Sequence, residues 1–451
     1  MRLDLDLEKL LKYAEKMGAS EAELSASITD KYIFEISKDS LERALSTTTI
    51  GFGIRVAIGK KIGAAGGEIT GEEGALEIIR HAIKIARSTR EDEKWPGFNP
   101  KIGKAPIEVP VHSEETASLT EEDGVKILQE QLKLVKESDP SITVAGAGFR
   151  VSRSYSEFIN SYGGPLGEKS TSYSYVLELK KKTGEGEGTY IDWKMGVKLD
   201  IEGIEETTRR AVSRVSDAVK ASPIEGFRGT LILDDAEAAS LLRILIVPAI
   251  SADNVQQRRS PLAGRLGEKV LSDKINIVDD PFLPYETGSA VFDDEGHPTS
   301  KKNVFEKGVL ATYLYDHYTA SIEGRESTGN GFKSAHHAPP SPSPSNLVLE
   351  STVHKEKLED AIGEVENGLY VVSTIGSWLS NPVSGQINAT VTLGYLIVGG
   401  EIQKPVKGVA ISGNIYEALA DSFQYTAGPR RCLFGVCSSS IVISDFTIAG
   451  H

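Results

Sequence analysis

Residue types that bind metals or act as nucleophiles are sparse in this chain of 451 residues, which has eight histidines and two cysteines. A helical zinc site needs two histidines four or five residues apart, with a glutamate between them as general base. No two histidines here have that spacing. The sequence therefore predicts no catalytic set of this kind, and no metal or cofactor bound by this chain. The histidines are His81, His112, His297, His317, His336, His337, His354 and His451.

Two smaller groups remain as candidates. His336 and His337 are adjacent, and adjacent side chains diverge on a strand or a helix, so they seldom bind one metal together. We interpret them either as pocket-lining residues or as a loop before the proline-rich run 339–344. Cys432 and Cys437 are separated by four residues, whereas a redox pair usually has two between its thiols. We expect Cys437 to be a buried small hydrophobe in a C-terminal strand.

The acidic and glycine-rich motifs do not complete an active site either. The acidic runs lie at expected strand ends or turns, where capping or turn formation explains them. Gly51-x-Gly53 lies between β-forming residues and precedes no helix, so it does not predict a dinucleotide fold, and no phosphate loop or nucleophile elbow is present. The acidic runs are Asp234-Asp235, Asp279-Asp280 and Asp293-Asp294-Glu295.

Composition limits the class of partner and the location. The net charge is −14 and the sequence pI is about 5.2. Nucleic-acid binders usually carry a basic face, and the longest basic run is only Lys180-Lys181-Lys182, so we expect no nucleic-acid partner. No stretch approaches about 18 uninterrupted apolar residues, so we expect no membrane span. The N-terminus is acidic and has no apolar targeting segment, which favours a cytoplasmic location.

Periodicity divides the chain into three blocks of an α+β protein. The first, 1–100, is expected to contain a helix capped by Asp6, then strands, then a helix opened by a capping box of Thr70 and Glu73. The second, 111–223, has a helix starting at Thr120 with Asp123, several strands and a closing helix. The third, 224–451, is expected to be a β-rich C-terminal domain.

Eight segments of the third block resemble the TldD/PmbA family, also called modulators of DNA gyrase, in the order that the family has them. The resemblance implies the family's fold of N-terminal helix and strand layers followed by a β-rich domain. The segments are Val278-Asp279-Asp280-Pro281, Phe292-Asp293-Asp294-Glu295-Gly296, Glu306-Lys307-Gly308-Val309-Leu310, Ser327-Thr328-Gly329-Asn330, Ser380-Asn381-Pro382-Val383-Ser384-Gly385, Gly399-Gly400-Glu401-Ile402-Gln403-Lys404-Pro405-Val406, Ile411-Ser412-Gly413-Asn414, and Cys437 through Ile448-Ala449-Gly450.

The resemblance also identifies the branch. TldD-like members carry His-Glu-x-x-x-His on a helix, which binds zinc together with a C-terminal cysteine. A gapless count places that window on residues 243–248 here, with Arg243 and Pro248 at the ligand positions and Ile244 at the general base. None of these side chains can take those roles. The chain thus resembles the PmbA/TldE branch, which lacks the motif, and Cys437 is the remaining candidate for a metal-binding position.

The function implied is that of a subunit without zinc. It would pair with a TldD-like, zinc-dependent peptidase, or with itself as a homodimer, and act on unfolded peptides bound as an added strand. Candidate peptide-binding residues are His336, His337, Trp378, Ser380 and Asn381, although the last three also suit an ordinary turn. Two alternatives stay open: an autonomous hydrolase using Cys437 or the His336-His337 pair, and a regulatory binding protein of the gyrase-modulator type.

Overall fold

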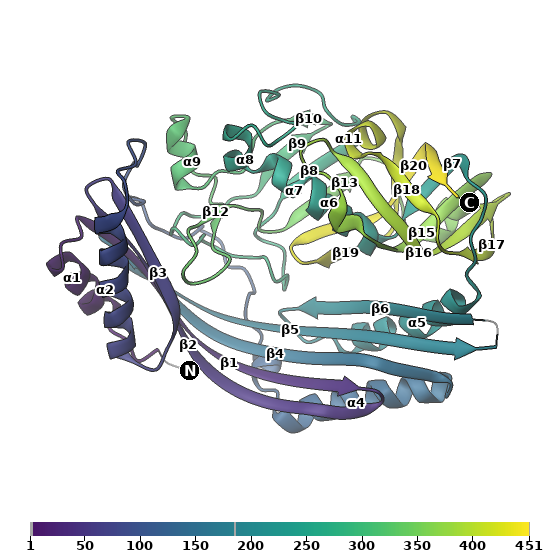
Figure 1. Ribbon diagram of the computed structural model, residues 1–451, viewed down its shortest axis with the longest axis horizontal. Coiled ribbons are helices and arrows are strands. Elements are labelled where there is room, and N and C mark those ends of the chain that lie inside the picture. The colour runs from purple at the N-terminus through teal and green to yellow at the C-terminus, as the bar shows by residue number, and fades with distance from the viewer. Residues whose placement is uncertain (1–2, 185, 451) are drawn as a thin grey trace.

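The computed structural model describes residues 3–184 and 186–450. Its N-terminal part is built on one antiparallel sheet of six strands in the order β3-β2-β1-β4-β5-β6, which curves beneath the C-terminal part (Figure 1). The strands are β1 (Glu21–Ser37), β2 (Ser40–Ile58), β3 (Lys61–Ile69), β4 (Ile142–Asn160), β5 (Gly163–Thr183) and β6 (Gly186–Gly196).

The long strands join the first two predicted blocks. β1 pairs with β2 of its own block and with β4 of the next block. One sheet therefore contains strands from both sides of the connection 100–111. Leu24 near the start of β1 is buried in one core cluster, and Phe34 near its end is buried in another. Two helices pack on the first half of the sheet and two on the second. The helices of this part are α1 (Leu7–Lys16), α2 (Glu72–Ser88), α3 (Glu114–Ala117), α4 (Glu121–Ser138) and α5 (Ile201–Lys220).

Helix starts were predicted with mixed success. Asp6 caps α1, and Thr120 and Asp123 form the expected capping box at the start of α4. The capping box expected at Thr70 and Glu73 is wrong: α2 begins after Gly71, with no side-chain cap.

The C-terminal part is a sheet of twelve strands. β7 pairs with both β15 and β20, which closes β20, β18, β16, β15 and β7 into a ring. The strands are β7 (Phe227–Leu233), β8 (Ile275–Asp279), β9 (Lys302–Glu306), β10 (Val309–Leu310), β13 (Leu347–Ser351), β14 (His354–Lys355), β15 (Asn367–Ile375), β16 (Gln386–Val398), β17 (Glu401–Val406), β18 (Ala410–Asn414), β19 (Phe423–Leu433) and β20 (Val436–Ala449); β11 (Gly331–Phe332) and β12 (Ser341–Pro342) pair separately.

Short helices cover this sheet, and α6 contacts β15, β19 and β20. The expectation of an α+β fold with a β-rich C-terminal region is confirmed. No helix within the described ranges is long and apolar enough to cross a membrane. The helices are α6 (Asp235–Leu245), α7 (Val247–Ile250), α8 (Ala252–Gln256), α9 (His317–Ile322), α10 (Leu358–Ile362), α11 (Ile415–Glu417), a 3-10 turn (Ser377–Leu379) and a π turn (Ala418–Ser422).

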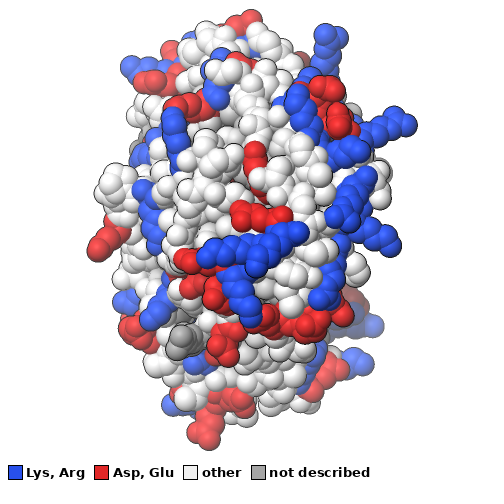
Figure 2. Space-filling view, turned by 90° about the vertical axis from the view of Figure 1, so that its left-hand side faces the viewer, with Lys and Arg blue, Asp and Glu red and all other residues white. Residues whose placement is uncertain are grey.

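Charges of both signs mix on the surface. Figure 2 shows the end of the molecule that carries α1 and α2, where Lys and Arg side chains lie next to Asp and Glu side chains.

Candidate functional site

Helix α6 carries two of the three positions that the resemblance assigns to the zinc motif. Arg243 lies exposed in its last turn, with its guanidinium 5.3 Å from the centre of the Phe434 ring. Ile244 packs against the hydrophobic core. Pro248 lies in the first turn of α7, and the helical path is interrupted before it because proline cannot donate the required hydrogen bond. The side chains at these positions do not fit a zinc ion.

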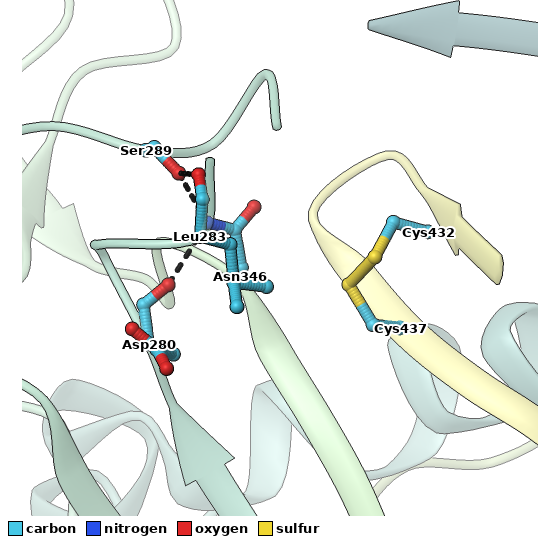
Figure 3. The surroundings of a disulfide bond; sticks show 6 residues. All are labelled: Asp280, Leu283, Ser289, Asn346, Cys432 and Cys437. Atoms are coloured by element: carbon cyan, nitrogen blue, oxygen red, sulfur yellow. Dashed lines mark hydrogen bonds between the residues drawn. A yellow bond between two sulfur atoms is a disulfide. The ribbon is translucent and has the colours of Figure 1, made fainter. Parts of the chain in front are cut away.

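The β19–β20 hairpin brings the two cysteines together. Cys432 and Cys437 are cross-strand partners, and their sulfurs form a disulfide (Figure 3). Cys437 is buried in β20, as expected, but it is bonded to Cys432 and is not a free thiol. A four-residue turn makes the two flanking residues direct cross-strand neighbours, within reach of each other's side chains. With the disulfide intact, neither sulfur is a thiolate that could bind a metal or attack a substrate.

A hydrogen-bonded loop supports the tip of this hairpin. Leu347 N–H donates to the Gly435 carbonyl at 2.8 Å. Asn346, the residue before Leu347, donates from its side-chain amide to the Asp280 carbonyl at 2.9 Å and to Ser289 Oγ at 3.0 Å (Figure 3). The turn that carries Phe434 is thus fixed by the disulfide and by main-chain contact with an ordered loop.

A cavity of about 200 Å³ lies between α6, the end of β15, the hairpin tip and β6. Its position next to Arg243 means that it occupies the place where the resemblance implies the catalytic centre of a TldD-like chain. Its lining residues are Ile191, Trp193, Ala236, Glu237, Ala239, Ser240, Arg243, Val372, Ser373, Thr374, Ser377, Leu433 and Phe434. We call it the α6 cavity.

Glu237 is the buried acid of the α6 cavity, with a relative exposure of 7%. The Thr374 hydroxyl donates to its Oε1 at 2.7 Å, and the Thr374 main chain also bonds the carboxyl. Burial raises the pKa of Glu237 to about 7, because removal from water disfavours the charged form, and the negative charge of Asp234 adds to the increase. The hydrogen bonds from Thr374 oppose the increase only in part.

An ion-pair network ties the walls of the cavity together. Arg431 on β19 donates to Asp192 on β6 and to Asp235 on α6. Arg431 also donates to the Trp193 carbonyl. Asp234, the N-cap of α6, accepts from Arg214 on α5 at 2.6 Å. Residues from both parts of the chain therefore position the same cavity.

The α6 cavity shares lining residues with two wider cavities between the first sheet and the C-terminal part. A wider cavity of about 650 Å³ adjoins it at Phe434 and is lined by Ser152, Ser170, Ser172 and other residues of β4 and β5. Another of about 760 Å³ shares Ile191 and Thr374 with it. The three cavities thus adjoin one another, and we call them together the groove.

The structure does not bring the predicted peptide-binding residues to one place. His336 contacts the first sheet: a side chain at Gly51 or Gly66 would collide with it. Burial lowers the pKa of His336. Trp378 is 66% exposed and lines none of the cavities described above, although its neighbour Ser377 lines the α6 cavity. Ser380 Oγ accepts from Asn388 N–H at 2.9 Å, and Asn381 Oδ1 accepts from Val383 N–H at 2.9 Å, as in ordinary turns.

Sequence reasoning missed the residues that line the α6 cavity most closely. An acid in the first turns of a helix is common, because it complements the helix dipole, so Glu237 gave no signal. Trp193 lies in a strand that is distant along the chain. The separation of Cys432 and Cys437 could have indicated a hairpin closed at its tip, and with it the exposed Phe434.

A second concentration of buried charge lies where β1 and β2 meet the C-terminal part, and we call it the Arg55 cluster. Arg55 donates to Glu23 at 2.7 Å and to Glu295 at 3.0 Å, and Lys333 lies 3.0 Å from Glu23. Burial by itself would raise the pKa of Glu23, but the charges of Arg55 and Lys333 lower it to about 2. Beside the cluster, His297 Nε2 and His317 Nδ1 are 3.0 Å apart.

Comparison with known proteins identifies the class and then the family. Residues 228–450 match the PmbA/TldA metallopeptidase C-terminal domain, and residues 114–219 match the central domain of the same proteins. The fold is therefore that of a metallopeptidase-type protein. The chain belongs to the TldD/PmbA family.

Individual relatives agree with this assignment along nearly the whole chain. An uncharacterized protein of Methanocaldococcus jannaschii is 29% identical over 93% of this chain and 94% of its own length. A metalloprotease of Methanothermobacter thermautotrophicus is 27% identical over 92% of this chain and 88% of its own. The crystal structure of TldE from Thermococcus kodakarensis superposes with a TM-score of 0.90 at 28% identity, covering 98% of this chain and all of that one.

Proposed function

We propose that this chain is the PmbA/TldE-like subunit of a zinc metallopeptidase complex, in which a TldD-like partner binds the zinc and this chain binds none. The observation that carries the proposal is the side-chain set on α6 and α7. At the positions that the resemblance assigns to the zinc motif the chain has Arg243, Ile244 and Pro248, and none of them can ligate zinc or act as a general base. Cys437, the other candidate ligand, is bonded to Cys432.

The proposed substrate is an unfolded peptide held along the groove. Three adjoining cavities suit an extended chain better than a compact ligand. β6 is the edge strand of the first sheet, and Thr189 and Ile191 on it line the groove. An edge strand can bind a peptide through main-chain hydrogen bonds, which gives affinity with little sequence selectivity. The proposal includes a cytoplasmic location and either a heterodimer with the TldD-like chain or, where none is present, a homodimer.

The test is zinc analysis combined with a peptide-cleavage assay. Both are applied to this chain alone, to a TldD-like chain of the same organism alone, and to the mixture. We expect zinc only in the partner and cleavage that is strongest in the mixture and abolished by chelator. Stoichiometric zinc in this chain, or chelator-sensitive cleavage by it alone, contradicts the proposal.

Two controls assign the activity within the mixture. A partner whose motif glutamate is replaced by glutamine should abolish cleavage although the two chains still associate. Thiol-blocking reagent applied to this chain before mixing should leave cleavage unchanged, because both of its cysteines are in the disulfide. Loss of cleavage in the second control instead supports a hydrolase that uses Cys437.

A further inference from the structure

The α6 cavity contains a buried acid without a cation. Glu237 forms an ion pair with none of the Lys, Arg or His side chains within the described ranges, and its hydrogen bonds come from Thr374. Arg243 lines the same cavity but lies over the Phe434 ring instead. Buried carboxyl groups are usually paired or hydrogen-bonded on all sides, so an acid that faces an open cavity without a counter-charge indicates a ligand that supplies one.

The other polar groups of the cavity suit a particular cation. Ser240 and Ser377, which carry hydroxyl groups, line it together with Glu237. A primary ammonium group has three donors and no acceptor, so it can use one carboxylate and two hydroxyl oxygens at once. A guanidinium group is planar and prefers a carboxylate in a bidentate arrangement, for which the Thr374 bonds leave less room.

The walls suit the carbon chain that bears such a group. Trp193 and Phe434 contribute aromatic rings, and Val372 and Leu433 contribute aliphatic side chains. Aromatic faces attract a cation, and the aliphatic walls bury the methylene groups next to it. The cavity volume of about 200 Å³ is that of a side-chain pocket, not of a site for a large cofactor.

We propose that the α6 cavity binds a primary ammonium group of a peptide, with Glu237 as its carboxylate partner and Trp193 and Phe434 as its aromatic walls. The ammonium group comes either from a lysine side chain or from the free N-terminus. The expectation that the ligand is a peptide rests on the proposed function; the ammonium selectivity rests on the cavity. This subunit then selects which peptides, or which end of a peptide, enter the groove at the level of α6.

The test is isothermal titration calorimetry of the full chain alone with four blocked or unblocked alanine-based pentapeptides. The first is blocked at both ends and has a central lysine. The second has norleucine instead, which keeps the methylene groups and removes the ammonium. The third is the norleucine peptide with a free N-terminus. The fourth is blocked and has a central arginine. A lysine source predicts binding of the first peptide, and an N-terminal source predicts binding of the third.

Matched variants assign the binding to the cavity. Glu237→Gln keeps the size and the acceptor for Thr374 but removes the charge, and should weaken binding about ten- to a hundredfold, the worth of a charge-assisted hydrogen bond. Glu364→Gln removes the same charge outside the three cavities, where the exposed Glu364 is paired with Lys355, and should leave binding unchanged. Thermal unfolding checks that both variants are folded.

The inference is overturned if neither the first nor the third peptide binds more tightly than the blocked norleucine peptide. It is also overturned if Glu237→Gln binds as tightly as the native chain, or if the lysine peptide binds and the arginine peptide binds as well as it does. Since the titration uses uncleaved peptides and no partner, its outcome is separate from the cleavage assay. Failure of cleavage in the mixture contradicts the proposed function and leaves the ammonium selectivity standing.

Discussion

The Arg55 cluster and the α6 cavity are both buried, charged junctions between the first sheet and the C-terminal part, but they differ in how their charges are balanced. In the Arg55 cluster the carboxylates of Glu23 and Glu295 share a guanidinium, and Lys333 adds a second cation. In the α6 cavity the Glu237 carboxyl has hydrogen bonds from Thr374 and no cation.

The pKa values express this difference. Glu23 is more buried than Glu237, yet its pKa falls to about 2, whereas that of Glu237 rises to about 7. Burial raises the pKa of a carboxyl group in both places, and only the nearby cations reverse the direction. A charge-balanced cluster stabilises the contact between two parts of a protein, whereas an acid without a cation beside a cavity can pair with a cationic ligand.

Arg55→Met should give the largest effect. It leaves Glu23 and Glu295 buried without their shared counter-charge, and removing one partner from a buried ion pair costs about 3–5 kcal/mol of unfolding free energy. Urea denaturation measures the loss. The matched control is Arg43→Met on the same strand. The Arg43 side chain is exposed, and its Nη1 lies 3.9 Å from Glu35 Oε2. That change should cost less than about 1 kcal/mol. Equal losses in the two variants contradict a structural role for the cluster.

Glu237→Gln should act in the opposite direction. The pKa of Glu237 is raised in the folded state, so the native chain has its full stability below the unfolded pKa of about 4.5 and loses stability as pH rises through about 7. The shift corresponds to about 3 kcal/mol at full ionisation. We expect the variant to be more stable than the native chain at pH 8, with a much smaller difference at pH 5.

Urea denaturation at the two pH values measures this difference in the absence of peptide. Glu187→Gln serves as the control, because Glu187 is at the surface and its pKa is lowered by Lys180. A stability difference for Glu237→Gln that is the same at both pH values contradicts a buried, uncompensated acid.

The two junctions also mark the limit of what the sequence could predict. Local signals were sufficient for the class of fold: the Asp6 and Thr120 caps lie where helices begin, and the alternation after residue 21 is a strand. The capping box predicted at Thr70 is wrong because Gly71 is the N-cap residue of α2. Gly71 has a φ of 159° and no side chain that could cap the helix. Such signals depend on neighbours in the sequence.

The sites depend on residues that are far apart along the chain. Arg55 and Glu295 are separated by 240 residues, and Thr374 and Glu237 by 137. No pattern in one sequence encodes those pairings. The resemblance assigns its motif to residues 243–248 because that motif is local, but it could not identify Glu237, which lies outside the motif.

Replacing the disulfide should affect the α6 cavity and leave the Arg55 cluster unchanged. The double change Cys432→Ser with Cys437→Ser opens a loop whose ends are five residues apart, which costs about 2 kcal/mol in the chain-entropy account. Hydrogen exchange should then increase at Phe434, which lines the α6 cavity, and at its neighbour Gly435, and stay unchanged near Arg55. Native chain treated with reductant should behave like the variant. Faster exchange at both junctions contradicts their independence.

His297→Gln should give the smallest effect, and it tests the junctions by acid. Burial lowers the pKa of His297 to about 4, and the neighbouring His317 adds to the decrease, while Glu295 opposes it. For a base with a lowered pKa, stability is present above the unfolded pKa of about 6.5 and is lost as pH falls toward 4. Between pH 6.5 and 4 the variant should therefore lose about 1–2 kcal/mol less unfolding free energy than the native chain, after allowance for solvent screening. Over the same interval the extra stability of Glu237→Gln over the native chain should shrink, because the native chain regains the stability of its neutral Glu237 as the pH falls toward 4.5. Acid then weakens the Arg55 side of the molecule and base weakens the α6 side, so the two pH profiles, measured by urea denaturation, distinguish the junctions within one protein.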